Sequence, residues 1–217
     1  MAGGSALNVA VHLGEILKAH NTRGYGRSRA SFFGLVGDDA FGRVLRKRLA
    51  DSDVGDAMLN SGDQGTGVCI VLSGPDDRGF VTQIGATGQL CIQHLGGVSE
   101  IIRSAENDSV SLHVSGFYSC HALQPDLAVF LGGVRREAEE VGKKLMVSLD
   151  TNCDASGVWG GGVLDILCEV DVFLPNETEA LGIAKGSHLE AACDFLAGRV
   201  RGCCVTTCGK DGCILQV

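Results

Sequence analysis

The stretch Val170 to Leu181 reads V-D-V-F-L-P-N-E-T-E-A-L and contains the fold's repeating unit. Its apolar run ends at Pro175, which has no backbone N–H to give to a sheet and therefore stops a strand. Asn176 follows where a helix would begin, and its side chain can accept from the N–H groups of the first turn. Glu179, three residues later, can reach back to the Asn176 N–H in a capping box. The stretch predicts a strand, a stop and a capped helix.

Two carboxylates in this stretch allow a second interpretation. Glu177 and Glu179 follow the carboxyl end of the predicted strand. In an α/β sheet that end borders the ligand crevice, where carboxylates can hold a magnesium ion. A capping box needs no ligand, because it satisfies the helix terminus by itself. The local sequence leaves both interpretations open.

Length and charge restrict the class of protein. The chain has 217 residues, 45% of them hydrophobic, which is enough for one large domain or a domain with an appendage. Its formal charge of −8, from 18 basic and 26 acidic residues, argues against binding to nucleic acid or to an anionic membrane. The sequence has no membrane-spanning apolar run and no signal segment at its start. We therefore expect a cytoplasmic protein.

The ten cysteines are scattered and form no C-x-x-C pair. Because most of them fall in apolar segments, we interpret them as small buried hydrophobic residues in a reducing compartment. A weaker alternative is a redox or metal-responsive role for the four that surround the last strands. These are Cys203, Cys204, Cys208 and Cys213.

Apolar runs and helical stripes alternate along most of the chain. Helices are predicted over 7–17, 41–49, 90–104, 125–141, 163–168 and 189–200, and strands over 31–36, 110–114, 145–149, 170–174, 203–206 and 213–217. Asp39 is the candidate cap of the second helix. Such alternation predicts an α/β fold with a mostly parallel sheet and helices on both faces.

One segment departs from the alternation. Two short β-type runs, 66–72 and 80–84, are joined by the turn-rich connector 73–79. This pattern predicts a hairpin that forms a small separate sheet. The chain also starts with a glycine turn that no strand precedes, and it ends inside a strand whose outer edge we expect to be uncovered.

Several well-known sites can be excluded directly. The sequence has no G-x-x-x-x-G-K-[ST] loop and no G-x-G-x-x-G turn between a strand and a helix, which removes P-loop NTPases and nicotinamide dehydrogenases. It has no G-x-S-x-G elbow and no H-x-x-x-H pair, which argues against nucleophilic and zinc hydrolases. His113, inside a predicted strand, is expected to be a satisfied core histidine.

Several segments at the predicted strand ends and turns, taken in their order along the chain, resemble the motifs of one protein family. They are Gly3–Asn8 (G-G-S-A-L-N), Gly34–Gly42 (G-L-V-G-D-D-A-F-G), Thr66-Gly67 through Gly85-Ala86, His113–Gly116, Asp150–Asn152, Pro175–Glu179 and Thr207–Gly212. In this order the whole chain resembles the PfkB, or ribokinase-like, family of carbohydrate and nucleoside kinases. The resemblance implies a three-layer Rossmann-like α/β domain over 1–217, with residues 64–86 inserted as a β lid.

The resemblance also implies a reaction and its participants. ATP would donate its γ-phosphoryl group to a hydroxyl of a small sugar or nucleoside, with Mg²⁺ as cofactor. The lid would exclude water and would offer a surface for a homodimer. The implied substrate-binding residues are Gly3, Gly4 and Asn8; the implied nucleotide-binding residues are Asn176, Thr207, Gly209, Lys210 and Gly212. Asn176 and Glu179 match the N-x-x-E motif as catalytic residues, with Glu179 as the metal ligand and Glu177 as a solvent or helix-dipole partner.

The sequence departs from the family pattern at its ends and at two internal positions. The G-A-G-D segment that supplies the catalytic base is expected after the last strand, and the chain ends at Val217. The strand expected before Gly3 is also missing. Ribokinase has lysine where Ser5 stands, and some relatives have arginine where Asp154 stands. We therefore expect an incomplete and inactive kinase domain, with a non-catalytic sugar- or nucleotide-binding or regulatory protein as the alternative.

Overall fold

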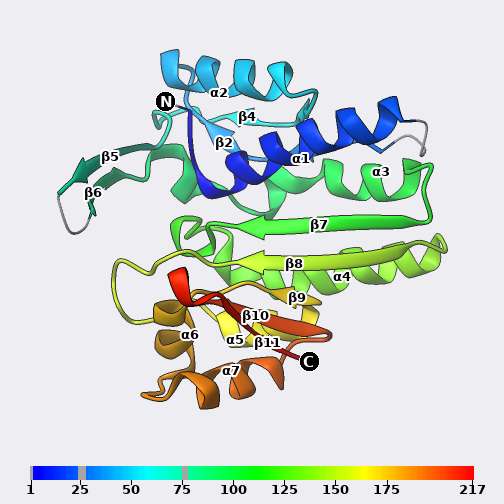
Figure 1. Ribbon diagram of the computed structural model, residues 1–217. Coiled ribbons are helices and arrows are strands. Elements are labelled where there is room, and N and C mark those ends of the chain that lie inside the picture. Colours follow the sequence, from blue (N-terminus) through cyan, green and yellow to red (C-terminus); the bar gives the residue numbers. More distant parts are fainter. Residues whose placement is uncertain (1, 24–27, 75–77) are drawn as a thin grey trace. The chain divides into compact units, whose positions relative to one another are not determined.

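The computed structural model describes residues 2–23, 28–74 and 78–217, and the chain divides into two compact units, 1–90 and 91–217 (Figure 1). The second unit contains a mostly parallel five-stranded sheet with helices packed on it. This arrangement confirms the α/β class predicted from the alternation. Among the described residues, none of the helices has the length and apolar content needed to cross a membrane.

In its described residues, the first unit contains two helices, a 3-10 turn and six short strands. In chain order they are α1 (Ser5–Thr22), β1 (Ser31–Phe32), β2 (Leu35–Val36), α2 (Ala40–Asp51), β3 (Gly55–Asp56), β4 (Leu59–Asn60), β5 (Val68–Ser73), β6 (Arg78–Gln83) and η1 (Gly85–Gln89). β1 pairs with β3 and β2 with β4, both in parallel, and β5 pairs with β6 in antiparallel. The predicted hairpin is therefore confirmed, although part of its connector, residues 75–77, lies outside the described residues.

Two predictions for the first unit were incomplete. The predicted strand 31–36 is two strands interrupted at Gly34, and β3 and β4 were not predicted. Strands of two residues are too short to show an alternating pattern, so only their pairing partners define them. The predicted helix 7–17 was also too short, because α1 spans Ser5–Thr22.

The core of the first unit lies between α1, α2 and the short strands. Leu7 and Val11 of α1 pack in one cluster with residues of α2 and of the short β segments. Not every apolar residue within the predicted helix 7–17 faces this core, because Val9 and Leu13 are 41% and 42% exposed. The buried face instead follows Leu7, Val11 and Gly14, at the i, i+4, i+7 spacing of a helix.

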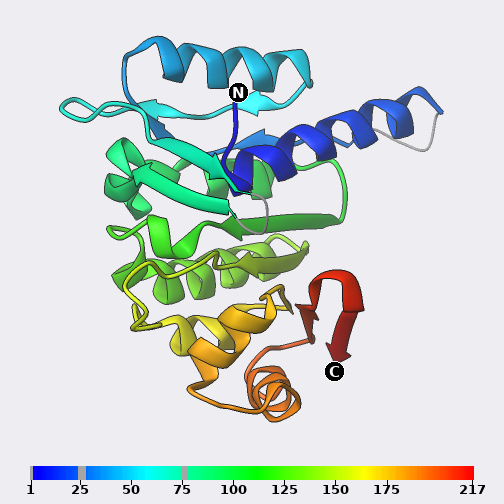
Figure 2. The same cartoon turned by 60° about the vertical axis from the view of Figure 1, so that its left-hand side comes forward.

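The second unit contains the sheet in the order β11-β10-β9-β8-β7. Its elements are η2 (Ile92–Leu95), α3 (Gly97–Ser104), β7 (Ser109–Ser115), η3 (Phe117–Ser119), η4 (Gln124–Asp126), α4 (Leu127–Glu140), β8 (Lys144–Asp150), α5 (Val163–Ile166), η5 (Leu167–Glu169), β9 (Val172–Phe173), α6 (Glu177–Ala184), α7 (Leu189–Ala197), β10 (Cys203–Thr207), η6 (Gly209–Asp211) and β11 (Cys213–Gln216). All neighbours are parallel except β10 and β11, which form a hairpin (Figure 2). The predicted strands and the longer predicted helices of this unit are present, with ends shifted by a few residues.

The longest strand pair sets the direction of the sheet. β7 and β8 run in register from Ser109 opposite Lys144 to Ser115 opposite Asp150. Val147 and Leu149 are fully buried, and the alternation of a strand places their neighbours Ser148 and Asp150 on the opposite face. The carboxyl ends of β7 and β8 therefore bring Ser115 and Asp150 side by side.

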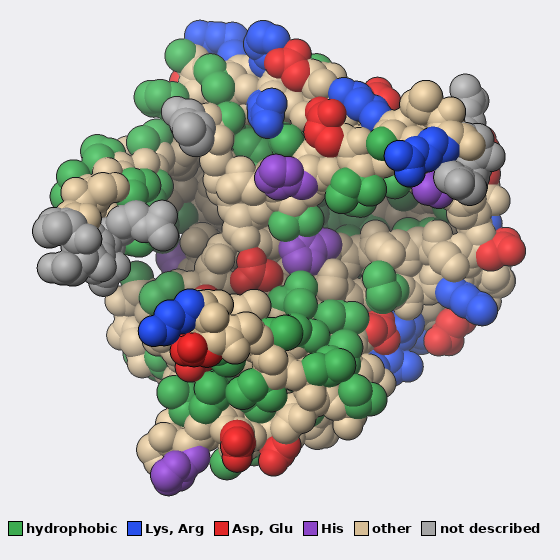
Figure 3. All heavy atoms as spheres, viewed as in Figure 1, with side chains coloured by type: hydrophobic (Ala, Val, Ile, Leu, Met, Phe, Trp, Pro, Cys, Tyr) green, Lys and Arg blue, Asp and Glu red, His purple; other side chains and the backbone are tan. Residues whose placement is uncertain are grey.

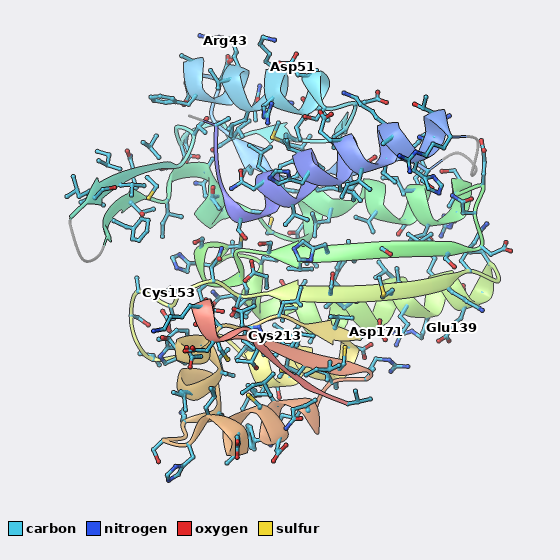
Figure 4. All side chains as sticks on the ribbon, in the orientation of Figure 1. Arg43, Asp51, Glu139, Cys153, Asp171 and Cys213 are labelled. Atoms are coloured by element: carbon cyan, nitrogen blue, oxygen red, sulfur yellow. The ribbon has the colours of Figure 1, made fainter. Side chains whose placement is uncertain are left out.

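An ion pair holds helix α4 to the start of β9. Asp171, labelled in Figure 4, lies one residue before β9. Its Oδ2 accepts from the Arg135 guanidinium at 2.8 Å and from the Val147 N–H at 2.7 Å. Arg135 is only 12% exposed, so the ion pair is largely shielded from water. Because Asp171 also bonds to Val147 of β8, the pair fixes the register of β9 against β8.

Candidate active site

The N-terminus of α6 forms the predicted capping box. The Asn176 Oδ1 accepts from the Glu179 N–H at 2.9 Å, and the Glu179 Oε2 accepts from the Asn176 N–H at 3.0 Å. The Asn176 side-chain amide also donates to Glu179 Oε1 at 2.8 Å. The spacing of three residues suffices for these bonds, because it places both side chains over the first turn. Glu177, by contrast, is exposed.

Burial gives Glu179 unusual electrostatics. The residue is only 5% exposed. Burial raises the pKa of the Glu179 carboxyl above its usual 4.5. The hydrogen bond from the Asn176 backbone N–H opposes this shift, and the negative charge of Asp150 adds to it. Both of its oxygens are hydrogen-bonded, yet the charged form is still disfavoured. A carboxylate held in this way gains from a cation that neutralises it.

Asp150 belongs to this site, although the sequence analysis did not select it as a site residue. Its Oδ2 accepts from the Ser115 hydroxyl at 2.9 Å, and its Oδ1 accepts from the Asn152 N–H at 3.2 Å. The carboxylate is near enough to Glu179 to raise the pKa of that carboxyl. The sequence signal was present, since Asp150 is the last residue of a strand adjacent to the one that precedes Asn176. Only the strand order showed that the two are neighbours.

The segment from Thr207 to Gly212 lies beside the capping box. Asn176 and Thr207 form an isolated parallel bridge, and the Thr207 N–H donates to the Pro175 carbonyl at 2.9 Å. Gly209 and Gly212 have φ of +54° and +95°, which side chains rarely tolerate, and the Cys208 N–H closes the loop on the Gly212 carbonyl at 2.8 Å. The side chain of Lys210 is exposed. The structure thus brings Asn176, Glu179 and this loop together in one unit.

The three predicted substrate-binding residues lie in the first unit. Gly3 and Gly4 precede α1, Gly4 is its N-cap with φ of +109°, and the Asn8 N–H donates to the Gly4 carbonyl at 3.0 Å. A Cβ at either glycine would meet no atom within 4 Å, and the Asn8 side chain is exposed. These residues are therefore accessible, and their role in binding stays a prediction.

In the first unit, helix α2 is also capped by a side chain, and its cap contacts the segment that leads into the hairpin. Asp39, the predicted cap of α2, accepts from the Gly42 N–H at 2.8 Å through Oδ1. The same carboxylate accepts from the Thr66 N–H at 2.7 Å and the Thr66 hydroxyl at 2.8 Å. These hydrogen bonds, that of Gly42 first, lower the pKa of Asp39 to about 2. Thr66 lies two residues before β5, so the base of the hairpin is fixed to α2.

His113 only partly fits the expectation of a satisfied core histidine. Its Nδ1 lies 2.9 Å from the Ser148 hydroxyl, across the β7–β8 pair. Its Nε2 is buried without a hydrogen-bond partner among the residues that the structure describes. Burial lowers the pKa of His113, with the charge of Asp150 opposing it. The ring is therefore held neutral.

The cysteines pack in the interior or lie singly on the surface. The Cys193 thiol donates to the Thr206 hydroxyl at 3.2 Å, and burial raises the pKa of Cys204 to about 11. Cys153, on the loop after β8, and Cys213, in β11, are exposed (Figure 4). All ten thiols are free, and within 2–23, 28–74 and 78–217 no three His, Cys, Asp or Glu side chains are grouped to hold a metal ion. The four-cysteine metal hypothesis therefore has no geometric support.

Solved structures share this fold over nearly the whole chain. Ribokinase from Giardia lamblia superposes with a TM-score of 0.75 at 20% identity, covering 98% of this chain and 62% of that one. Adenosine kinase from Anopheles gambiae, in complex with P1,P4-di(adenosine-5) tetraphosphate, superposes with a TM-score of 0.75 at 25% identity, covering 100% and 62%. The fold is therefore ribokinase-like.

Sequence comparison shows the family. The pattern of the pfkB family of carbohydrate kinases matches residues 1–216, so the chain belongs to this family. It is 26% identical over 192 residues to adenosine kinase of Saccharomyces cerevisiae and 25% identical over 183 residues to that of Dictyostelium discoideum. These matches cover 88% and 84% of this chain but 51% and 49% of the relatives. The chain thus spans about half the length of the curated relatives it matches.

Proposed function

We propose that this chain is part of a kinase that transfers the γ-phosphoryl group of ATP to a hydroxyl of a small sugar or nucleoside. The observation that carries the proposal is the Asn176–Glu179 capping box with its buried Glu179, with Asp150 beside it and the Thr207–Gly212 loop alongside. A helix N-terminus favours phosphate groups, because its free N–H groups carry partial positive charge. Phosphoryl transfer depends on positioning and charge stabilisation, which this arrangement supplies.

The site fits a magnesium ion better than a transition metal. Mg²⁺ is held in kinases by one or two carboxylates together with the phosphate oxygens of the substrate. Glu179 and Asp150 supply two carboxylates, and the raised pKa of Glu179 shows that their negative charge is incompletely compensated. A bound magnesium ion would neutralise charge on the phosphates. Glu179 would hold it, and Asn176 would orient Glu179.

The remaining roles are assigned by position. Thr207, Gly209, Lys210 and Gly212 would line the nucleotide site with Asn176. The positive-φ glycines leave backbone open to a ligand at a loop that contacts the capping box. In the first unit, the exposed Gly3, Gly4 and Asn8 would bind the sugar or nucleoside hydroxyls, since an amide side chain both donates and accepts hydrogen bonds.

The hairpin β5–β6, within residues 64–86, is proposed to be a lid and a dimer contact. Ile70 and its cross-strand partner Val81 are 56% and 58% exposed, and the next pair, Val71 and Phe80, is 49% and 63% exposed. Because successive residues of a strand point to opposite faces, both faces of this ribbon are apolar. Hydrophobic side chains are visible on the face that is turned to the viewer in Figure 3. A ribbon with two apolar faces can cover a substrate with one face and a second copy with the other.

The nucleotide assignment is tested by calorimetric titration of the chain with ADP and Mg²⁺. We expect ADP to bind only when Mg²⁺ is present, and we expect Glu179→Gln to weaken this binding at least tenfold. Glu177→Gln is the matched control, because it makes the same change two residues away on an exposed side chain. Equal losses in the two variants, or binding indifferent to magnesium, would contradict the proposal.

The transfer reaction is tested by incubating the full-length gene product with radiolabelled ATP and a panel of sugars and nucleosides. Label transferred to an acceptor hydroxyl, and lost with Glu179→Gln, is the result expected of a kinase. Nucleotide binding without transfer by the full-length gene product would instead favour the non-catalytic binding or regulatory protein.

A further inference from the structure

Tyr118 has a buried hydroxyl with no apparent structural use. The residue is 7% exposed, and its hydroxyl has no hydrogen-bond partner in the described part of the chain. Its backbone N–H donates to the Thr151 carbonyl at 3.2 Å, which fixes it to the loop after β8. A buried polar group without a partner costs free energy, and phenylalanine would fill the same space without that cost. The neighbouring Phe117 ring is fully buried.

Aromatic contacts place Tyr118 beside the first turns of α6. Its ring packs edge-on against Trp159, with ring centres 5.6 Å apart and planes at 85°. Trp159 in turn lies directly on Gly182 of α6, where any Cβ would overlap the indole ring. Gly182 follows Glu179 by three residues, so the two lie on the same face of the helix. The contacts lead from Tyr118 through Trp159 to the face that carries Glu179.

Two carboxylates lie near the Tyr118 hydroxyl, and Glu179 has more free acceptor capacity than Asp154. Burial, followed by the negative charges of Asp154 and Glu179, raises the pKa of Tyr118 far above its usual 10, so the hydroxyl stays a donor. Asp154 is occupied by its own loop, accepting from the Ser156 N–H and hydroxyl and from the Trp159 N–H. Glu179 accepts two bonds from Asn176, and a carboxylate has about four lone-pair sites.

We propose that Tyr118 is a positioning residue for the cation-binding carboxylate, its hydroxyl donating to Glu179 when a divalent cation binds there. This inference rests on the proposed function. Asn176 now donates to both Glu179 oxygens, and a cation bound there would compete with these donors for the oxygen lone pairs. Tyr118 would then supply a replacement donor from the Trp159 side of the helix. Partners of this kind hold a ligating carboxylate in place and typically change metal affinity 10- to 100-fold.

The test is the affinity of the chain for Mn²⁺, alone and with ADP, measured from free Mn²⁺ by electron paramagnetic resonance. We expect Tyr118→Phe to weaken Mn²⁺ binding about tenfold. The substitution keeps the ring, so the melting temperature should not fall and the emission of Trp159, the chain's one tryptophan, should not shift. Ser52→Ala is the matched control, because it also deletes a fully buried hydroxyl without a described partner, but in the first unit.

The outcomes separate this inference from the proposed function. If the parent chain does not bind Mn²⁺, or if Glu179→Gln binds it equally well, the metal site itself is wrong and the role of Tyr118 falls with it. If Glu179→Gln abolishes binding while Tyr118→Phe stays within twofold of the parent, only the role of Tyr118 is overturned. A loss in Tyr118→Phe matched by Ser52→Ala would also overturn it, since any buried hydroxyl would then act alike.

Discussion

The helices α2 and α6 each have a hydrogen-bonded carboxylate at the N-terminus, yet the two carboxylates differ in position and in electrostatics. Asp39 is the N-cap of α2 and accepts bonds from Gly42 and Thr66, and its pKa falls to about 2. Glu179 is the third residue of α6, accepts bonds from Asn176, is buried and lies near Asp150, and its pKa rises. A carboxylate at a helix N-terminus is therefore favoured in its charged form in one unit and disfavoured in it in the other. The comparison shows that the surroundings of a cap, and not the cap itself, distinguish a structural contact from a candidate site.

The largest effect on stability is expected from Asn176→Ala. It removes the acceptor for the Glu179 N–H and the side-chain donor to a buried carboxylate, leaving only the backbone N–H of residue 176 as donor, so the free energy of unfolding should fall by about 2 to 3 kcal/mol. Urea denaturation followed by circular dichroism measures the loss. Asn176→Ser keeps an oxygen for the Glu179 N–H and should lose less. Equal losses in the two variants would mean that the Glu179 side chain does not depend on Asn176.

Thr66→Val tests the corresponding contact at α2. The change keeps the shape but removes the hydroxyl that donates to Asp39 and accepts from the Gly37 N–H. We expect a loss of about 1 to 2 kcal/mol in the same denaturation experiment, because a buried N–H is left without a partner. Thr178→Val makes the same change on an exposed residue of α6 and should stay within about 0.5 kcal/mol. A loss at Thr178 as large as that at Thr66 would contradict the contact.

The two carboxylates should give pH dependences of opposite sign. The folded pKa of Asp39 is depressed, so its contribution to stability is present above its unfolded pKa of about 3.8 and is lost as pH falls toward 2. The folded pKa of Glu179 is raised, so its charged form lowers the free energy of unfolding above that pKa. This loss of stability disappears as the carboxyl is protonated at lower pH. Carbon NMR of the carboxyl groups measures both titrations. A Glu179 that titrates below 4.5 would remove the contrast.

The smallest effect is expected from Asp150→Asn. Removing its negative charge should lower the pKa of Glu179 toward, but not to, its usual value, because burial is the larger cause of the shift. The same NMR titration measures it. Asp108→Asn is the control, since Asp108 precedes β7 at the opposite end of the sheet and should leave Glu179 unchanged. An unchanged pKa in Asp150→Asn would attribute the shift to burial alone.

The second unit was more predictable from the sequence than the first. Its strands are longer and its helices alternate with them, so apolar runs such as 145–149 predicted β8 almost to its ends. In the first unit the strands β1 to β4 have two residues each, and pairing across the chain defines them. The buried face of helix α1 could not be predicted from the sequence for a related reason. Which of its apolar residues face inward depends on what packs against the helix, and not on the helical period alone.

The sequence by itself determined the contacts that a short spacing permits. Asn176 and Glu179, and Asp39 and Gly42, are three residues apart, so a single helical turn brings each pair together whatever surrounds it. Only the tertiary structure decided that Thr66, 27 residues from Asp39, completes one cap, and that Asp150 and Tyr118 stand near the other. Those neighbours come from strand order and helix packing, which depend on the burial of apolar surface across the whole unit. Hydrogen bonds then lower the pKa of Asp39, whereas burial and the charge of Asp150 raise the pKa of Glu179.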